Sequence, residues 1–214
     1  MTVKVSAASY IVGAVLGLGG AAAKLSRLRL LRYLGDLYTT IVRSLPELLL
    51  ILLLYYTGTR GLNDLIRAAG FSGDVDLSPF MAAVFSLGFI SGAYMTEVFR
   101  GAILAVPKGQ IEAAKAIGMS MPLRLERILL PQMLRYALPG LGNLWLVLLK
   151  DSSLVSVVSL AELTNAGRIG AGFTKHYLYF YFILGICYLI LTVFSMGLMA
   201  LLEKRLNRGE RGLA

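Results

Sequence analysis

Charged residues are scarce in this sequence. Only 15% of its 214 residues are Asp, Glu, Lys or Arg, whereas a soluble domain carries roughly 25%. Hydrophobic residues make up 57% of the chain, and the mean hydropathy is +0.73. These residues stand in long blocks and not in short periodic stripes. The low charge and the long apolar blocks together exclude an ordinary soluble domain.

Residues that build metal and catalytic sites are also nearly absent. Cys187 is the only cysteine and His176 the only histidine, which leaves no disulfide and no cluster of metal ligands. The segment 19–26 places glycines before Lys24, but it lacks the glycine directly before the lysine that a phosphate-binding P-loop requires. We therefore predict no catalytic residues, no metal and no bound cofactor in this chain, and an energy source on a partner.

Apolar segments long enough to cross a bilayer are, in contrast, abundant. About 20 apolar residues span the hydrocarbon layer as a helix, and only helices or closed barrels satisfy their backbone there. The sequence therefore predicts an all-α, polytopic membrane protein with one domain over residues 1–214. The five predicted spans are Val3–Ala23, Tyr38–Tyr56, Phe80–Leu104, Leu138–Leu160 and Tyr177–Leu202. Lys150 and Asp151 fall within the fourth span and require either a helix break or a water-lined face.

The distribution of positive charge predicts the orientation of these spans. Lys and Arg concentrate in the cytoplasmic segments of membrane proteins. If the N-terminus is outside, fourteen of the 21 Lys and Arg residues lie in the cytoplasm and five lie outside. The fourteen are Lys24, Arg27, Arg29, Arg32, Arg100, Lys108, Lys115, Arg124, Arg127, Arg135, Lys204, Arg205, Arg208 and Arg211. We therefore expect an external N-terminus, a cytoplasmic C-terminus and no nucleic-acid partner, because the net charge of +9 mainly reports topology.

A polar, positively charged segment, 107–131, separates the third and fourth predicted spans. Residues 112–131 read EAAKAIGMSMPLRLERILLP, and the informative positions are Glu112, Ala113, Ala114, Gly118, Ile128, Leu130 and Pro131. Gly118 predicts the turn that ends a first short helix, and Pro131 predicts the end of a second. The two alanines leave room for a partner surface, and Glu112 would suit the positive end of the helix dipole near a helix start.

This spacing resembles the EAA loop of the membrane subunits of bacterial ATP-driven (ABC) importers. The segments Thr96–Ala102, Pro107–Gln110, Tyr136–Gly140 and Leu149–Ser156 resemble the polar amino-acid uptake branch of these permeases. Residues Gly20–Ser26 and Arg43–Leu48 narrow the resemblance to the histidine/lysine-arginine-ornithine permeases and their octopine and nopaline relatives. The resemblance covers nearly the whole chain.

The resemblance implies a type I importer permease fold and a transmembrane subunit, in the bacterial inner membrane, that imports a basic or opine-type amino acid. The loop 107–131 would couple the chain to a partner ATPase. The implied partners are two nucleotide-binding subunits that hold ATP and Mg, a second permease or a second copy of this chain, a periplasmic amino-acid-binding protein and the lipid bilayer.

Several ionisable and polar residues within the spans are candidates for the substrate pathway. They are Glu47, Glu97, Asn143, Asp151 and Ser152. A charge in hydrocarbon is costly unless it faces protein or water, so each carboxylate needs a partner or a wet surface. An ion pair or a helix-end role remains open for each of them, and Glu97 with Arg100 could instead lock the third span to the loop.

Two pairs of glycines suggest close helix packing. Gly13 and Gly17, and likewise Gly88 and Gly92, have the spacing that lets membrane helices approach each other. The spacing does not say whether the partner helix belongs to this chain or to another subunit.

Two other classes of membrane protein remain as alternatives. A secondary transporter often contains inverted repeats, but no repeat is visible here and five spans do not divide into equal halves. A membrane scaffold with no transport role would have no need for the loop 107–131. Co-purification with an ATPase would separate these classes.

Overall fold

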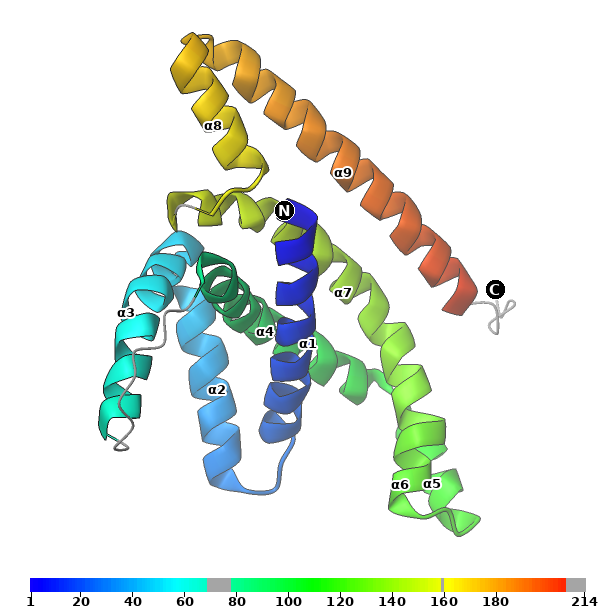
Figure 1. Ribbon diagram of the computed structural model, residues 1–214. Helices are drawn as coiled ribbons and strands as arrows, with labels where there is room; N and C mark the ends of the chain where they lie inside the picture. Colours follow the sequence, from blue (N-terminus) through cyan, green and yellow to red (C-terminus); the bar gives the residue numbers. More distant parts are fainter. Residues whose placement is uncertain (69–77, 159, 207–214) are drawn as a thin grey trace.

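The computed structural model describes residues 1–68, 78–158 and 160–206, and within this part it contains helices and no β-strand. This confirms the all-α class. Arg208 and Arg211 of the charge pattern, and the end of the predicted domain, lie outside the described residues. In Figure 1 the short helices α5 (Lys108–Ala116) and α6 (Met121–Arg124) lie at one end of the molecule, and the turn between α8 (Leu163–Thr174) and α9 (Tyr177–Leu206) lies at the other.

Four continuous stretches are long and apolar enough to cross a membrane. They are Thr2–Lys24 (α1), Pro79–Ala105 (α4), Met121–Val158 and Tyr177–Arg205. A fifth candidate is the pair α2 (Arg29–Ser44) and α3 (Glu47–Ala68), which passes the same test through Arg29–Ser44 and Glu47–Gly58 if the pair counts as one broken span. The number of candidate spans is five, as predicted, if the pair α2–α3 counts as one span, and four if it does not.

The prediction of one continuous second span over Tyr38–Tyr56 was wrong. The chain breaks between Ser44 and Glu47, and the two helices are bent by 112°. Leu45 is extended, with φ −100° and ψ 147°, as expected for a residue directly before a proline. Pro46 lacks the backbone N–H that would continue the helix. The break places Glu47 in the first turn of α3 and Arg43 in the last turn of α2.

The main packing contact joins α1 and α4 along the two glycine pairs. A Cβ added at Gly13 would collide with Ser91 Oγ, and one added at Gly17 would lie 2.6 Å from Met95 Cβ. A Cβ at Gly88 would lie 2.7 Å from Val12 Cγ1. Both glycine pairs therefore pack within this chain, where missing side chains let two backbones approach closely.

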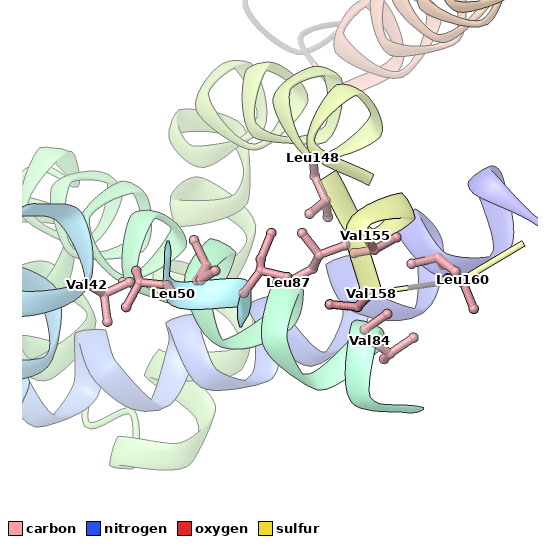
Figure 2. Packing of buried hydrophobic residues seen from close by; sticks show 13 residues of the cluster. Val42, Leu50, Val84, Leu87, Leu148, Val155, Val158 and Leu160 are labelled. Carbon is pink, nitrogen blue, oxygen red and sulfur yellow. The ribbon is translucent and has the colours of Figure 1, made fainter. Parts of the chain in front are cut away.

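Two buried apolar clusters hold the helices together. The larger draws on α1, α2, α3, α4, α7 (Leu130–Asp151) and the 3₁₀ segment η2 (Ser152–Val158), and Figure 2 shows its packing. Its labelled members are Val42, Leu50, Val84, Leu87, Leu148, Val155, Val158 and Leu160. The smaller cluster joins α1, α4 and α7 through Ala21, Met95, Phe99, Ala102, Met133, Ala137 and Leu141. Helices α1, α4 and α7 contribute to both clusters, and α4 also packs against α1, α2, α3 and α7, so it is the central helix of the described chain.

The predicted role of Pro131 as the end of a short helix was wrong. Pro131 lies in the first turn of α7, and α6 continues into α7 through a π-helical turn, η1 (Leu125–Leu129). In this turn Leu130 N–H donates to the Leu125 carbonyl. Proline is tolerated in the first turn of an α-helix, and here a π-helical turn, an irregularity in the helical hydrogen bonding, directly precedes it. The fourth span consequently begins earlier than the predicted Leu138.

The charged pair in the fourth span does mark a break in the α-helix. The α-helical part of α7 ends at Asp151, and the chain continues as the 3₁₀ segment η2. Ser152 Oγ donates to the Leu149 carbonyl over 2.7 Å and so caps one of the last carbonyls of α7. Asp151 is therefore the last α-helical residue before the break.

A buried carboxylate, Glu162, organises the start of α8. Its two oxygens accept from the Asn165 N–H at 2.8 Å and from the Thr164 N–H at 2.9 Å, which makes it the N-cap of the helix. The Tyr188 hydroxyl of α9 also donates to Glu162 over 3.2 Å, and Thr2 of α1 donates to it over 3.5 Å. Glu162 therefore fastens α8 and α9 to the start of α1.

Candidate translocation cavity and coupling loop

A cavity of about 220 Å³ opens among α3, α4 and the second half of α7. Apolar residues form much of its wall: Leu87, Ile90, Leu144, Val147 and Leu148. Five polar residues complete it: Glu47, Ser91, Tyr94, Asn143 and Asp151. A mostly apolar cavity with a few converging polar groups is the usual form of a small-molecule site.

The carboxyl groups of Glu47 and Asp151 meet at this cavity. Glu47 comes from the first turn of α3 and Asp151 is the last residue of α7, and both residues line this one cavity. Two carboxylates that share a site away from bulk water repel each other. A cation placed between them relieves that repulsion, and so does a shared proton.

The structure brings together three of the five residues that the sequence suggests for the pathway. Glu47, Asn143 and Asp151 line the cavity. Glu97 and Ser152 are not among its lining residues. Ser152 is buried and binds the Leu149 carbonyl, and Glu97 is held in an ion cluster described below.

Sequence reasoning missed two polar residues of the wall, Ser91 and Tyr94. Both lie on α4, three residues apart, so they share one face of the helix. Their spacing within an apolar span was the signal that could have identified them. It was weak because serine and tyrosine carry no charge that demands a wet or paired environment.

The ion cluster around Lys24 joins three helices, α1, α2 and α4. The Lys24 ammonium, only 11% exposed, pairs with Glu97 of α4 and lies 2.9 Å from Asp36 Oδ1 of α2. It also donates to Thr39 Oγ1 over 2.9 Å. Arg100 Nε donates to the second oxygen of Glu97 over 3.0 Å. Glu97 is therefore neutralised by two cations of its own chain.

The loop 107–131 contains the turn that Gly118 predicts. Gly118 has φ +76°, a left-handed conformation that favours glycine. Gly118 N–H donates to the Lys115 carbonyl over 3.0 Å, and Met119 N–H donates to the Ala114 carbonyl over 3.0 Å. This is the Schellman arrangement that ends a helix at a glycine. Within the described chain no atom lies within 4 Å of a Cβ built at Gly118.

Two expectations for the first short helix were wrong in detail. Glu112 is the fifth of the nine residues of α5, and the first turn of α5 contains no acidic residue. It is therefore too far from the helix start to gain much from the dipole, which acts within the first turn. Ala114 is 3% exposed and faces its own chain, whereas Ala113 is exposed.

The remaining loop residues divide between the interior and the surface. Ile128 is partly buried, whereas Leu130 and Pro131 are exposed. Two further apolar side chains are more exposed than Leu130, which is 46% exposed: Ile117 at 77% and Met121 at 65%. They flank the Gly118 turn at the end of the molecule that α5 and α6 form (Figure 1). Exposed apolar side chains on a polar loop favour contact with another protein.

Comparison with known proteins gives a consistent family match. The profile described as "binding-protein-dependent transport system inner membrane component" matches residues 13–208. The chain is 48% identical over 212 residues to the nopaline transport system permease protein NocQ of Agrobacterium fabrum, covering 99% of this chain and 90% of NocQ. It is 42% identical over 211 residues to the histidine/lysine/arginine/ornithine transport system permease protein HisQ of Escherichia coli, covering 99% and 92%.

A solved structure supports the same fold. The crystal structure of an amino acid ABC transporter with histidines contains a chain that is 32% identical to this one. The two superpose with a TM-score of 0.79 over 96% of this chain and 90% of the other. The helical arrangement described above is therefore that of an ABC importer permease.

Proposed function

Because the chain belongs to the family of inner membrane components of binding-protein-dependent transport systems, we propose that it forms part of the pathway through which such a system imports a basic or opine-type amino acid. The chain is a permease subunit and not an enzyme, since the ATPase of these systems is a separate chain. Residues 1–214 form one permease domain, with 107–131 as its coupling loop.

The paired carboxyls of Glu47 and Asp151 are the observation that supports a cationic cargo. They face one cavity, and Asn143, Ser91 and Tyr94 add neutral hydrogen-bonding groups around them. A cation in the cavity would gain two charged hydrogen bonds and remove the repulsion between the carboxylates. Lysine, arginine, ornithine and the opines derived from basic amino acids all present such a cation.

The coupling loop supports the second half of the proposal. Glu112, Ala113, Gly118, Leu130 and Pro131 are exposed at one end of the molecule, together with Ile117 and Met121, whereas Ala114 and Ile128 hold the loop together. Two ATPase subunits, which bind ATP and Mg, would dock here, one on this chain and one on a second permease or a second copy. A periplasmic amino-acid-binding protein would deliver cargo at the opposite end.

The mechanism is an equilibrium between two states that ligands at both ends can bias. ATP binding by the partner would move the loop 107–131. The loop continues through η1 into α7 without a break in the helix, and α7 ends at Asp151 in the cavity. Movement of the loop would therefore be transmitted along α7 to the cargo site. The charge pattern sets the expected orientation in the inner membrane: N-terminus outside, C-terminus in the cytoplasm.

Reconstitution of the assembled importer tests this function. We expect the chain to co-purify with its ATPase and to support cargo-stimulated ATP hydrolysis and ATP-dependent uptake of radiolabelled L-arginine in proteoliposomes. Ile117→Asp should abolish co-purification of the ATPase, because it places a charge on an exposed apolar contact. The control is Lys108→Asp, which changes an exposed residue of the same loop and should weaken co-purification far less. Ile11→Asp would not serve as a control, because Ile11 lies in a span.

Two results would contradict the proposal. Uptake that follows an ion gradient and needs no ATPase would favour a secondary transporter. Normal co-purification and normal cargo-stimulated hydrolysis with Ile117→Asp would mean that the ATPase docks elsewhere.

A further inference from the structure

Arg43 is a cation next to the cavity that the proposed function does not yet use. It lies in the last turn of α2, directly before the break that leads to Glu47. Its guanidinium carbon, Cζ, lies 5.6 Å from the centroid of the Tyr94 ring, and Tyr94 is part of the cavity wall. The Arg43 side chain is exposed on the surface of this chain.

The guanidinium of Arg43 has no carboxylate partner within the parts of the chain that the structure describes. The ion pairs seen there involve Lys24 and Arg100 with Asp36 and Glu97. A cation that belongs to a membrane segment and lacks an ion pair is costly, and such residues usually serve substrates or ions. The face of Tyr94 offers a cation–π contact that holds the guanidinium without neutralising it.

An amino-acid cargo needs such a cation. The free amino acid carries an α-carboxylate as well as its cationic groups, and the carboxylates of Glu47 and Asp151 would repel that α-carboxylate. Arginine pairs with carboxylates through two parallel hydrogen bonds, which gives both affinity and orientation. Lys150 is the other cation close by, but it is exposed, is not part of the cavity wall, and has Asp151 as its electrostatic neighbour.

We propose that Arg43 binds the α-carboxylate of the cargo, with Tyr94 holding its guanidinium at the cavity. This inference rests on the proposed function of the cavity as a site for cationic amino acids. Arg43 is then a specificity residue: it separates amino acids from amines that have the same side-chain cation but no carboxylate. The contrasting role is that of a fixed counter-ion for the carboxyls of Glu47 and Asp151, which never contacts cargo.

A binding experiment with two probes separates these roles. The assembled importer in lipid nanodiscs, without the soluble binding protein, is titrated with L-arginine and with agmatine, which is arginine without its carboxylate. We expect the unmodified importer to prefer L-arginine. Arg43→Gln should weaken binding of L-arginine by about 10- to 100-fold, the usual effect of losing a charged hydrogen-bonded pair, and leave agmatine binding unchanged.

Two further variants sharpen the result. Arg43→Lys keeps the charge but loses the paired hydrogen bonds, so its affinity for L-arginine should lie between those of the unmodified protein and of Arg43→Gln. It also serves as the test if Arg43→Gln fails to assemble. Lys150→Gln is the matched control and should leave the preference for L-arginine intact. Equal loss of both probes with Arg43→Gln, no loss of either, or no preference in the unmodified importer would overturn the proposal.

Failure of the underlying function gives a different pattern. Glu47→Gln should weaken L-arginine and agmatine alike, because both probes carry the guanidinium that the carboxyls bind. If Glu47→Gln and Asp151→Asn leave both probes unaffected, the cavity does not bind the cationic group and the proposed function fails. If those variants weaken both probes while Arg43→Gln weakens them equally, only the inference about Arg43 fails.

Discussion

At the scale of single residues, the carboxylates of the membrane segments that the sequence singles out, Glu47, Glu97 and Asp151, have two kinds of surroundings. Glu97 is surrounded by cations of its own chain, Lys24 and Arg100, within a cluster that joins helices. Glu47 and Asp151 face the same cavity. A carboxylate that is already paired gains little from a cationic ligand, whereas two that repel each other gain a great deal. The second group therefore has the chemistry of a binding site.

Asp151→Asn should reduce uptake of cationic cargo about 10-fold more than uptake of neutral cargo, since it removes one charged hydrogen bond to the cation. The measurement is ATP-dependent uptake of L-arginine and of L-glutamine by proteoliposomes that contain the assembled importer. Ser152→Ala is the matched control, because Ser152 is the next residue but lies outside the cavity wall. Equal loss for both cargoes, with normal assembly, would remove Asp151 from the substrate ligands.

Lys24→Met should lower the free energy of unfolding by about 3 kcal/mol, because Glu97 is then left largely buried with only Arg100 as its partner. Thermal unfolding of the purified importer in detergent measures this loss. Lys4→Met, a change at an exposed lysine of the same helix, should have little effect. Adding Glu97→Gln to Lys24→Met should cost less than the sum of the two single changes; simple additivity would argue against the ion pair.

At the scale of elements, the coupling loop is a helix, a glycine turn and a second helix that runs on into α7. The turn is defined by backbone hydrogen bonds and by the positive φ of Gly118. The π-helical turn η1 lies directly after α6, and the joint between loop and span is therefore helical throughout. A continuous helix transmits a displacement of the loop to the span better than a flexible linker does. Coupling to an ATPase would require such transmission.

Gly118→Ala should impair coupling, because a residue with a Cβ pays about 1–2 kcal/mol in the left-handed region. Gly118→Asn should retain more activity, since asparagine adopts this conformation more readily. Cargo-stimulated ATP hydrolysis by the reconstituted importer is the measurement. Equal and complete loss with both variants would mean that the space beside Gly118 is filled by the partner, and that the backbone angle is not the cause.

At the scale of the whole molecule, the pair α2–α3 determines how many times the chain crosses the membrane. With this pair as one broken span, the five candidate spans place the two termini on opposite sides. With four spans, the termini would share a side. The excess of Lys and Arg on one set of connecting segments favours the first arrangement.

Topology reporters test this arrangement directly. A fusion within residues 110–125 should report a cytoplasmic location, and one near Asp74, which lies outside the described residues, an external one. The paired readout of an alkaline phosphatase fusion and a fluorescent-protein fusion at each site distinguishes the two sides. A reversed pattern would contradict both the orientation and the docking of an ATPase at the loop.

Local features of the fold followed from the sequence because they depend on neighbouring residues alone. Length and hydropathy identified the apolar helices, and Gly118 identified its turn. The break before Glu47 was also present in the sequence as Leu45–Pro46, but the apolar run that follows it, residues 48–54, concealed it. Pro131 misled for the opposite reason: a proline in the first turn is compatible with a helix, and only the helix boundaries decide whether it begins or ends one.

Which residues meet across the bundle was decided by the tertiary structure. Glu97 and Asp151 were both among the pathway candidates, yet Glu97 pairs with Lys24 and Asp151 lines the cavity, because helix rotation and packing determine what a side chain contacts. The glycine spacings predicted that helices approach each other closely, but not which helices. In the structure the glycine pair of α1 packs against α4, and the pair of α4 packs against α1. By itself, the sequence determined that the chain crosses a membrane and carries a polar loop between two of its spans. The cavity that Glu47 and Asp151 line required the packing of α3, α4 and α7, since its walls come from residues more than a hundred positions apart.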